Sequence, residues 1–178
     1  MIFEEKTIVS KEIYRGRILC LREETVALPG GKEGKREIVS HPGAVAVVAA
    51  SESGIILVRQ YRKPVEEALW ELPAGKLEPS EEPQQAARRE LAEETGYEPG
   101  RLDYLACLYL SPGFSNERIY LYQAEDLQPG EAHPDGDEFL EVASFSRKKL
   151  ETMIKEGQIR DAKTVAGLLL SSAKGGEL

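Results

Sequence analysis

The sequence lacks long apolar runs and has few cysteines. Its longest apolar runs, such as residues 44–50, are far too short to span a bilayer. The charged residues 4–6 stand so close to the first methionine that we expect no signal peptide. Cys20 and Cys107, the two cysteines, lie in apolar contexts typical of reduced core residues. These absences favour a cytoplasmic protein with no membrane partner.

A basic cluster is also missing. The 178 residues include 23 Lys and Arg against 31 Asp and Glu, which gives a net charge of −8. Because no basic patch offsets this charge, nucleic acid is not an expected partner. An anionic substrate would need local help from arginines or metal ions. The two histidines, His41 and His133, have no partners that suggest a catalytic dyad.

The order of expected elements indicates the fold class. Strands are expected at residues 2–11, 26–28, 35–39, 44–50, 55–60, 68–72, 102–110, 118–124 and 139–145, with hairpin turns at 29–31 and 51–54. Residues 14–21 are expected to form either a strand or a bend followed by a strand. Helices are expected at 80–96, at 146–156 with Ser146 as N-cap, and at 161–172 with an apolar face at Val165, Leu168 and Leu169. This order predicts an α+β fold, an α/β/α sandwich with a mixed sheet between helices.

A boundary is expected at His41-Pro42-Gly43. It separates an N-terminal β-hairpin extension, residues 1–42, from a main domain, residues 43–178. An extension of about 40 residues cannot bury much surface alone. We expect it to pack on the main domain or on a second copy of the chain.

The segment Gly75 to Tyr97 is expected to form the central helix. Ser80 is the expected N-cap, which would place Glu81 and Glu82 in the first turn beside the positive end of the helix dipole. Gly96 is a natural end, because glycine readily adopts the left-handed C-terminal cap.

Three glutamates share one arc of this helix. Glu90 and Glu94 lie roughly 40° apart, and Glu93 lies roughly 60° further round. No Lys or Arg is expected among them, so the like charges repel by about a few tenths of a kcal/mol per pair. A hard, oxygen-seeking cation would convert this repulsion into binding energy. Arg89 is expected to lie away from the arc and to orient a glutamate such as Glu81 by a salt bridge.

The same segment resembles the Nudix box at every specified position. Gly75 is followed after five residues by Glu81, and after seven more by Arg-Glu-Leu-x-Glu-Glu-x-Gly-Tyr, which begins at Arg89. The resemblance implies a Nudix fold and a pyrophosphohydrolase. Divalent ions held by clustered carboxylates would neutralise the pyrophosphate and activate a water. Mg2+ suits such an all-oxygen site, with Mn2+ as a substitute. The alternative is a solvated helix whose arginines balance its glutamates.

The resemblance implies a set of metal ligands. These are Glu90, Glu93, Glu94 and the backbone carbonyl of Ala74. Gly75 would then be small so that the chain and the metal can approach closely.

The resemblance also implies three catalytic acids. They are Glu93 and Glu94 of the box and Glu138, a loop residue that could act as general base or orient the water. Asp137 and Asp135 are rivals for the role of Glu138, and a solvated acidic loop is the other interpretation.

Segments outside the box indicate a branch of the family. Pro112, sixteen residues after Gly96, resembles the marker of the ADP-ribose pyrophosphatase branch. The resemblance covers about residues 7–170 and includes segments 14–18, 59–62, 71–75 and 137–138. It implies hydrolysis of ADP-ribose to AMP and ribose 5-phosphate. The alternatives are another nucleoside diphosphate sugar, such as GDP-mannose, and a catalytically silent nucleotide-binding module.

The resemblance to this branch implies three groups of substrate-binding residues. Arg62 would contact phosphate, a role suited to its fork of donors, although a surface arginine is the alternative. The adenine pocket would contain Arg17, Ile18, Arg36 and Glu37, although an ordinary strand edge is the alternative for the first two. The terminal ribose would be lined by Ser111, Gly113 and Glu117. In the family a second subunit often helps to bind adenosine through an exchanged N-terminal segment, so a homodimer is expected.

Overall fold

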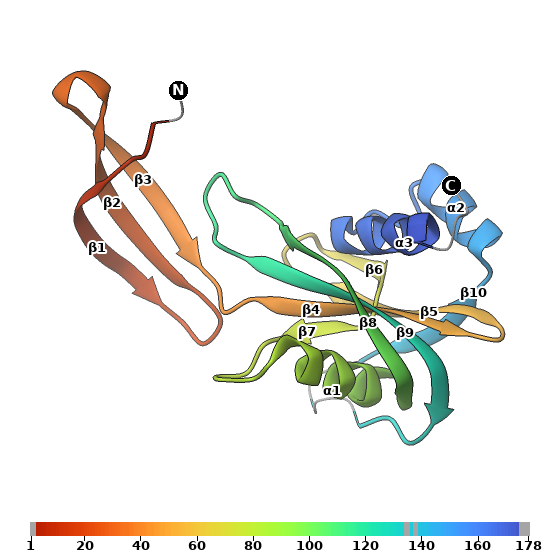
Figure 1. Cartoon of the computed structure of the whole chain (residues 1–178). Helices are drawn as coiled ribbons and strands as arrows, with labels where there is room; N and C mark the ends of the chain where they lie inside the picture. The colour runs from red at the N-terminus through yellow and green to blue at the C-terminus, as the bar shows by residue number, and fades with distance from the viewer. Residues whose placement is uncertain (1–2, 134–135, 137–138, 175–178) are drawn as a thin grey trace. The chain divides into compact units, whose positions relative to one another are not determined.

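The structure, a computed structural model, describes residues 3–133, 136 and 139–174. The chain divides into two compact units (Figure 1). The first comprises Met1–Gly43 and Tyr109–Arg118, and the second comprises Ala44–Leu108 and Ile119–Leu178. Among the helices in the described ranges, none is both long and apolar enough to cross a membrane.

The first unit is built on a three-stranded antiparallel sheet. Its strands, in spatial order, are β1 (Thr7–Arg15), β2 (Cys20–Leu28) and β3 (Lys32–Ser40). The 3-10 turn η1 (Pro29–Gly31) joins β2 to β3, and Gly30 has a φ of 74°, which glycine adopts without steric cost. The predicted hairpin is therefore confirmed. The first strand begins and ends later than predicted, at Thr7 and Arg15. Residues 14–21 contain the bend that was one of their two expected forms, because the chain turns after β1, where the Gly16 amide donates to the Leu19 carbonyl at 2.9 Å, and β2 begins at Cys20.

The segment Tyr109–Arg118 is bound to the end of β3. The Val39 amide donates to the Phe114 carbonyl at 2.8 Å, and the Asn116 amide donates to the Val39 carbonyl at 3.2 Å. The Asn116 side chain accepts from the His41 amide at 2.8 Å. These bonds attach the loop that contains Ser111, Gly113 and Glu117 to the first unit.

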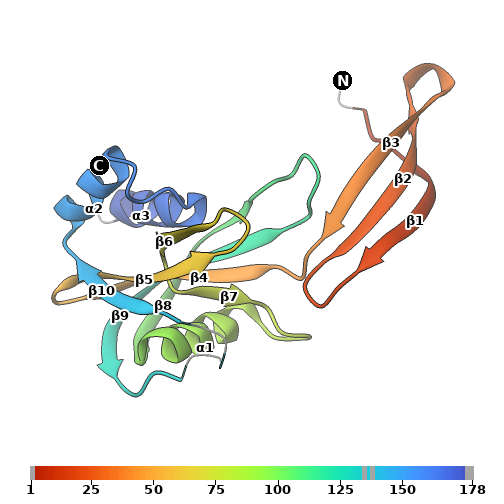
Figure 2. The same ribbon diagram turned by 180° about the vertical axis from the view of Figure 1, so that it is seen from behind.

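The second unit is a mixed sheet between helices. Its strands are β4 (Ala44–Ser51), β5 (Gly54–Arg62), β6 (Glu67–Glu71), β7 (Ala74–Lys76), β8 (Tyr97–Tyr109), β9 (Arg118–Pro129) and β10 (Glu141–Phe145). Its helices are α1 (Pro83–Thr95), α2 (Arg147–Lys155) and α3 (Ala162–Lys174). The central strand β4 runs parallel to β9 and antiparallel to β5 and β7. Helix α1 covers one face of the sheet and α3 the other (Figures 1 and 2), so the predicted sandwich is confirmed.

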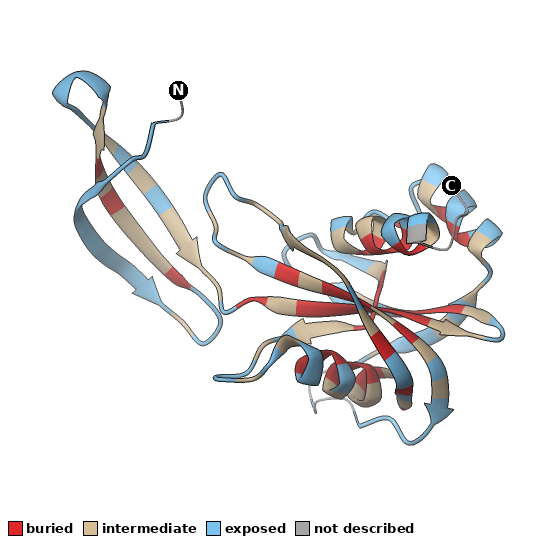
Figure 3. Cartoon of the chain, viewed as in Figure 1, coloured by how far each residue is buried: buried red, intermediate tan, exposed pale blue. Residues whose placement is uncertain are grey.

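The core of this unit lies on both faces of β4. On one face Val45 and Val47 pack with Leu91 of α1, all fully buried. On the other face α3 approaches closely, because a Cβ added at Gly167 would lie 3.2 Å from the Val48 side chain. Figure 3 shows the buried residues concentrated along the middle of the sheet and on the helix faces turned toward it.

The β4–β5 hairpin opens into a wedge that β6 and β7 fill. Strand β5 pairs with β4 only near its start and with β6 from Val58 to Arg62. Strand β4 pairs with β7 from Ala44 to Ala46. The Pro73 carbonyl between β6 and β7 accepts from the Val47 amide at 2.9 Å. Residues 71–75 therefore cross the centre of the sheet.

The start of the central helix differs from the prediction. Helix α1 begins at Pro83 with Glu82 as N-cap, and no acid lies in its first turn. Ser80 is not the cap but lies in a turn, with a φ of 66°. The predicted end is confirmed, because Gly96 has a φ of 73° and its amide donates to the Ala92 carbonyl.

The two C-terminal helices are found near their predicted positions. Ser146 caps α2 as predicted by accepting from the Lys149 amide at 3.3 Å. The predicted apolar face of α3 is partly wrong, because Leu168 is buried but Leu169 is 50% exposed. The buried face of α3 includes Thr164 and Ser171. The Thr164 hydroxyl accepts from the Leu72 amide, and the Ser171 hydroxyl donates to the Gln123 side chain.

Candidate active site

Gly75 and Glu90 are in very close contact where β7 meets α1. A Cβ added at Gly75 would lie 2.0 Å from the carboxylate carbon of Glu90. No real Cβ approaches so closely, so any other residue would force the glutamate away. The sequence therefore needs glycine here to bring a carboxylate onto the backbone.

Glu94 lies one helical turn further along α1, against the same strand. It is 2% exposed, and its Oε2 accepts from the Ala74 amide at 3.0 Å. Glu90 and Glu94, one helical turn apart, thus both contact the segment Ala74–Gly75.

Arg89 binds three nearby acids, Glu81, Glu90 and Glu93, rather than lying away from the acidic arc. Its Nε and Nη2 donate to the two oxygens of Glu81, each at 2.9 Å, which confirms the predicted salt bridge. Its Nη1 also donates to Glu90 at 2.8 Å and to Glu93 at 2.9 Å, so the prediction that Arg89 avoids the acidic arc is wrong. The long side chain allows one guanidinium to bridge three carboxylates.

These contacts shift the ionisation of Arg89 and Glu81. The hydrogen bonds to Glu81 are the main cause that raises the pKa of Arg89, although burial lowers it. In return, the hydrogen bond from Arg89 lowers the pKa of Glu81. Both groups are therefore held in their charged forms at neutral pH.

The donor set fits a hard divalent cation in its chemistry. Glu90, Glu93, Glu94 and the Ala74 carbonyl offer only oxygen atoms, which Mg2+ prefers. The missing Cβ of Gly75 leaves room for a carboxylate beside the backbone. Within the described residues, however, no three His, Cys, Asp or Glu side chains are already gathered as a metal site. Glu93 instead points toward Arg89, to which it is bonded.

A partly buried ion pair joins Arg62, at the end of β5, to Glu71, at the end of β6. The Nε and Nη2 atoms of Arg62 donate to the two carboxylate oxygens of Glu71 at 2.7 and 2.8 Å. Lys163 of α3 is a further donor to Glu71. Burial raises the pKa of the Glu71 carboxyl, but the two cations outweigh it and hold the pKa below its usual value. Sequence analysis assigned no role to Glu71.

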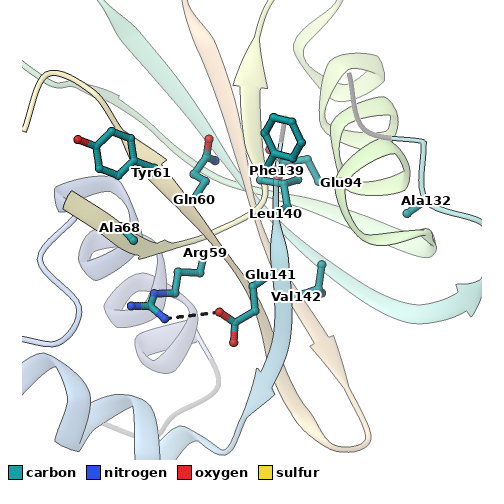
Figure 4. Close-up of a pocket in the computed structure, with 10 residues that line it drawn as sticks. All are labelled: Arg59, Gln60, Tyr61, Ala68, Glu94, Ala132, Phe139, Leu140, Glu141 and Val142. Atoms are coloured by element: carbon teal, nitrogen blue, oxygen red, sulfur yellow. Dashed lines mark ion pairs between the residues drawn. The ribbon is translucent and has the colours of Figure 1, made fainter. Parts of the chain in front are cut away.

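An open cavity of about 720 Å³ lies beside Glu94 (Figure 4). Two exposed aromatic rings line it: Tyr61, which is 58% exposed, and Phe139, which is 86% exposed. Arg59 and Glu141, which also line the cavity, form an ion pair with 3.5 Å between their charged atoms. The cavity lining thus combines charged and polar side chains with aromatic and apolar ones, as ligand pockets commonly do.

The remaining predicted residues belong to the first unit. Ile18 is 51% exposed between β1 and β2, next to Arg17. Arg36 is bonded to Glu5 at 2.8 Å, and Glu37 lies opposite Glu23 in the sheet. The other three are Ser111, Gly113 and Glu117 of the loop bound to β3. Glu138 and its rivals Asp137 and Asp135 lie outside the described residues.

Two family models match most of the chain. A family model described as the NUDIX domain matches residues 39–168. The chain belongs to the Nudix family. A second model, described as the nucleoside diphosphate sugar hydrolase N-terminal domain, matches residues 5–39. The protein is therefore a Nudix hydrolase, and members of that family generally depend on a divalent metal ion and act on small nucleotide sugars.

Similar proteins span almost the same length. The chain is 48% identical over 167 residues to a methanol dehydrogenase activator of Bacillus methanolicus, covering 92% of this chain and 90% of the relative. It is 46% identical over 164 residues to an ADP-ribose pyrophosphatase of Bacillus subtilis (strain 168), covering 90% and 89%. The crystal structure of an ADP compounds hydrolase matches with a TM-score of 0.88 at 21% identity, covering 100% of this chain and 99% of that one. This last likeness supports the Nudix fold.

Proposed function

We propose that this Nudix hydrolase cleaves the pyrophosphate bond of ADP-ribose to give AMP and ribose 5-phosphate. The observation that carries the proposal is the 46% identity, over nearly the whole chain, to an ADP-ribose pyrophosphatase. The intact box supports it, because Glu90 and Glu94 both lie against Ala74–Gly75.

The acids of α1 would hold the metal ion. Glu90, Glu93, Glu94 and the Ala74 carbonyl are the proposed ligands, and Mg2+ is the proposed ion. A bound divalent ion would neutralise the pyrophosphate and lower the pKa of a water. Arg89 would hold Glu90 and Glu93 in place through its hydrogen bonds.

Other residues would orient the substrate and the water. Arg62 would contact a phosphate, because its guanidinium offers donors that match phosphate oxygens. Glu93, Glu94 and Glu138 are the proposed catalytic acids, with Glu138 as the general base. Ser111, Gly113 and Glu117 are the proposed contacts of the terminal ribose.

The first unit would bind adenosine in a homodimer. Arg17, Ile18, Arg36 and Glu37 are the proposed adenine contacts, supplied by the exchanged residues 1–42 of a partner chain. Strand β1 is exposed along its whole length and carries four large apolar side chains: Ile8, Val9, Ile13 and Tyr14. Such a strand is a ready surface for pairing, which supports packing of a second copy on it. We also propose a cytoplasmic location, which the free thiols of Cys20 and Cys107 support.

A substrate panel tests the proposed activity. The purified full-length protein is incubated with Mg2+ and ADP-ribose, GDP-mannose or other nucleoside diphosphate sugars, and the products are separated by chromatography. We expect AMP and ribose 5-phosphate, with the highest kcat/KM for ADP-ribose. No AMP under conditions where GDP-mannose is cleaved would show that the substrate is wrong. Replacing Mg2+ by Mn2+, and adding a chelator, identifies the metal requirement.

A regulatory role is the second candidate. It is favoured by the 48% identity to a protein named as a methanol dehydrogenase activator. A purely regulatory module would bind nucleotide without cleaving it and would not need every acid of the box. In the test, the wild-type protein or its Glu94→Gln variant is added to a methanol dehydrogenase, and both the dehydrogenase rate and nucleotide hydrolysis are measured. Activation by the wild type together with absence of any hydrolysis would favour this candidate over the first.

A further inference from the structure

Glu71 is a fully buried charge that the proposed chemistry leaves without a role. It is 1% exposed, at the point where β6 ends and the chain enters the wedge of the sheet. A buried carboxylate is costly unless cations and hydrogen bonds compensate it. Arg62 and Lys163 supply that compensation from two different elements.

The pairing with Arg62 fixes the plane of the guanidinium. Two parallel hydrogen bonds, from Nε and Nη2, engage both carboxylate oxygens. Within the described residues, Nη1 makes no hydrogen bond, so this third nitrogen can still bind a substrate oxygen. The pKa of Arg62 is raised chiefly by the hydrogen bond with Glu71, and the negative charge of Glu94 adds to the shift. Tyr61, the residue before Arg62, lines the same cavity as Glu94, the acid proposed to hold the metal.

Glu71 is in turn held by the beginning of α3. Lys163, its second cation, also lies 3.0 Å from Asp161. Asp161 accepts from the amide and the hydroxyl of Thr164 at 2.9 and 2.6 Å, and the Thr164 hydroxyl accepts from the Leu72 amide at 2.9 Å. Glu71 and its neighbour Leu72 are thus both anchored, and the carboxylate cannot swing without breaking bonds to α3.

We propose that Glu71 is a positioning residue that holds Arg62 in the orientation needed to bind the substrate diphosphate beside Glu94. The proposal rests on the proposed hydrolysis and on the role of Arg62 in phosphate binding. It goes further because it assigns a function to a buried acid outside the Nudix box. Glu71 touches neither substrate nor metal and acts only through Arg62.

A double-mutant cycle separates this role from a purely structural ion pair. Steady-state kcat and KM for ADP-ribose with Mg2+ are measured for the full-length wild type, Arg62→Ala, Glu71→Gln and the double variant. The matched control is Glu67→Gln, because Glu67 lies on the same strand and pairs with Arg160, just before α3, but is exposed. Circular dichroism and thermal unfolding establish that each variant is folded.

The expected result is a shared, non-additive loss. Arg62→Ala and Glu71→Gln should each raise KM by about tenfold or more, and the double variant should match Arg62→Ala within about twofold. Glu67→Gln should stay within about twofold of the wild type. A Glu71→Gln enzyme with the wild-type KM, or a double variant showing the product of both losses, would overturn the proposal.

Glu71→Asp keeps the test valid if Glu71→Gln does not fold. This change retains the charge but draws the carboxylate back by one methylene, so KM should rise although the fold is retained. An unchanged KM would overturn the positioning role. If the wild type cleaves a different nucleotide sugar, the proposed substrate is wrong, and the same cycle is run with that compound because its diphosphate also needs Arg62. Wild-type kinetics for Arg62→Ala would overturn the positioning role while leaving the hydrolysis intact.

Discussion

The carboxylate of Glu90 lies where a side chain at Gly75 would begin, 2.0 Å from the position of an added Cβ. Gly75→Ala must therefore displace Glu90 from the backbone of β7. Misplacing a catalytic group by about 1 Å can reduce the rate by about a hundredfold. We expect kcat to fall by about that factor at saturating Mg2+, and to recover little when more metal is added.

Circular dichroism provides the control for Gly75→Ala. The helical signal should persist, because the clash involves the end of one side chain and leaves the helix core untouched. A folded variant with wild-type kcat would show that the contact between Gly75 and Glu90 has no part in catalysis.

Glu94→Gln tests the proposed metal ligand with little change in shape. Glutamine can still accept a hydrogen bond from the Ala74 amide through its side-chain oxygen, but it lacks the charge that attracts a divalent ion. Turnover of ADP-ribose should fall by orders of magnitude while the fold remains intact. Isothermal titration with Mg2+ should show weaker binding.

Glu98→Gln is the matched control for Glu94→Gln. Glu98 is exposed and lies four residues later. Its replacement should leave turnover unchanged. If Glu94→Gln also kept full turnover, the assignment of Glu94 as a metal ligand would be wrong.

Local signals in the sequence were sufficient for part of this site. Three features were predicted correctly because they depend on neighbouring residues. They are the hairpin turn at Gly30 and Gly31, the end of α1 at Gly96 and the cap at Ser146. The predicted start of α1 at Ser80 was wrong, because tertiary contacts override the preference of serine for caps. Glu81 turns back to accept from the Glu78 amide and is also held by Arg89, so the chain makes a turn before the helix begins.

Long-range charge pairs could not be predicted from local patterns. Glu71 finds its partners nine and 92 residues away in the sequence. The prediction for Arg89 considered only its angle around the helix and ignored how far an arginine side chain reaches to either side. Burial of a carboxylate depends on which cations the fold brings to it, and that information appears only in the assembled structure.

Lys163→Met should make the protein less stable and less sensitive to acid. The pKa of Glu71 is below its ordinary value of 4.5 in the folded protein, so the charged pair adds stability above pH 4.5 and loses it as pH falls through the lowered pKa. Without Lys163 the pKa of Glu71 rises, so the part of the unfolding free energy that is lost in acid becomes smaller. The free energy of unfolding at pH 7 should fall by on the order of 3 kcal/mol, as for other broken buried pairs.

Urea unfolding between pH 3 and 7 measures the effect of Lys163→Met. The curves of wild type and variant should converge as the pH falls. Lys148→Met, at an exposed position on α2, should run parallel to the wild type at every pH. Parallel curves for Lys163→Met would show that the ion pair with Glu71 does not contribute to acid stability.

Ile13→Asp tests whether a second copy covers β1. Ile13 is 51% exposed on an edge strand whose residues are all exposed, and burying an aspartate there would require removing its charge from water. Light scattering after size-exclusion chromatography should show a dimer for the wild type and a monomer for the variant. KM for ADP-ribose should rise with dissociation, because Arg17 and Ile18 are proposed to reach the substrate of the partner chain.

Leu169→Asp, equally exposed on α3, should change neither property. A monomeric wild type, or a dimeric variant with unchanged KM, would contradict the exchanged arrangement.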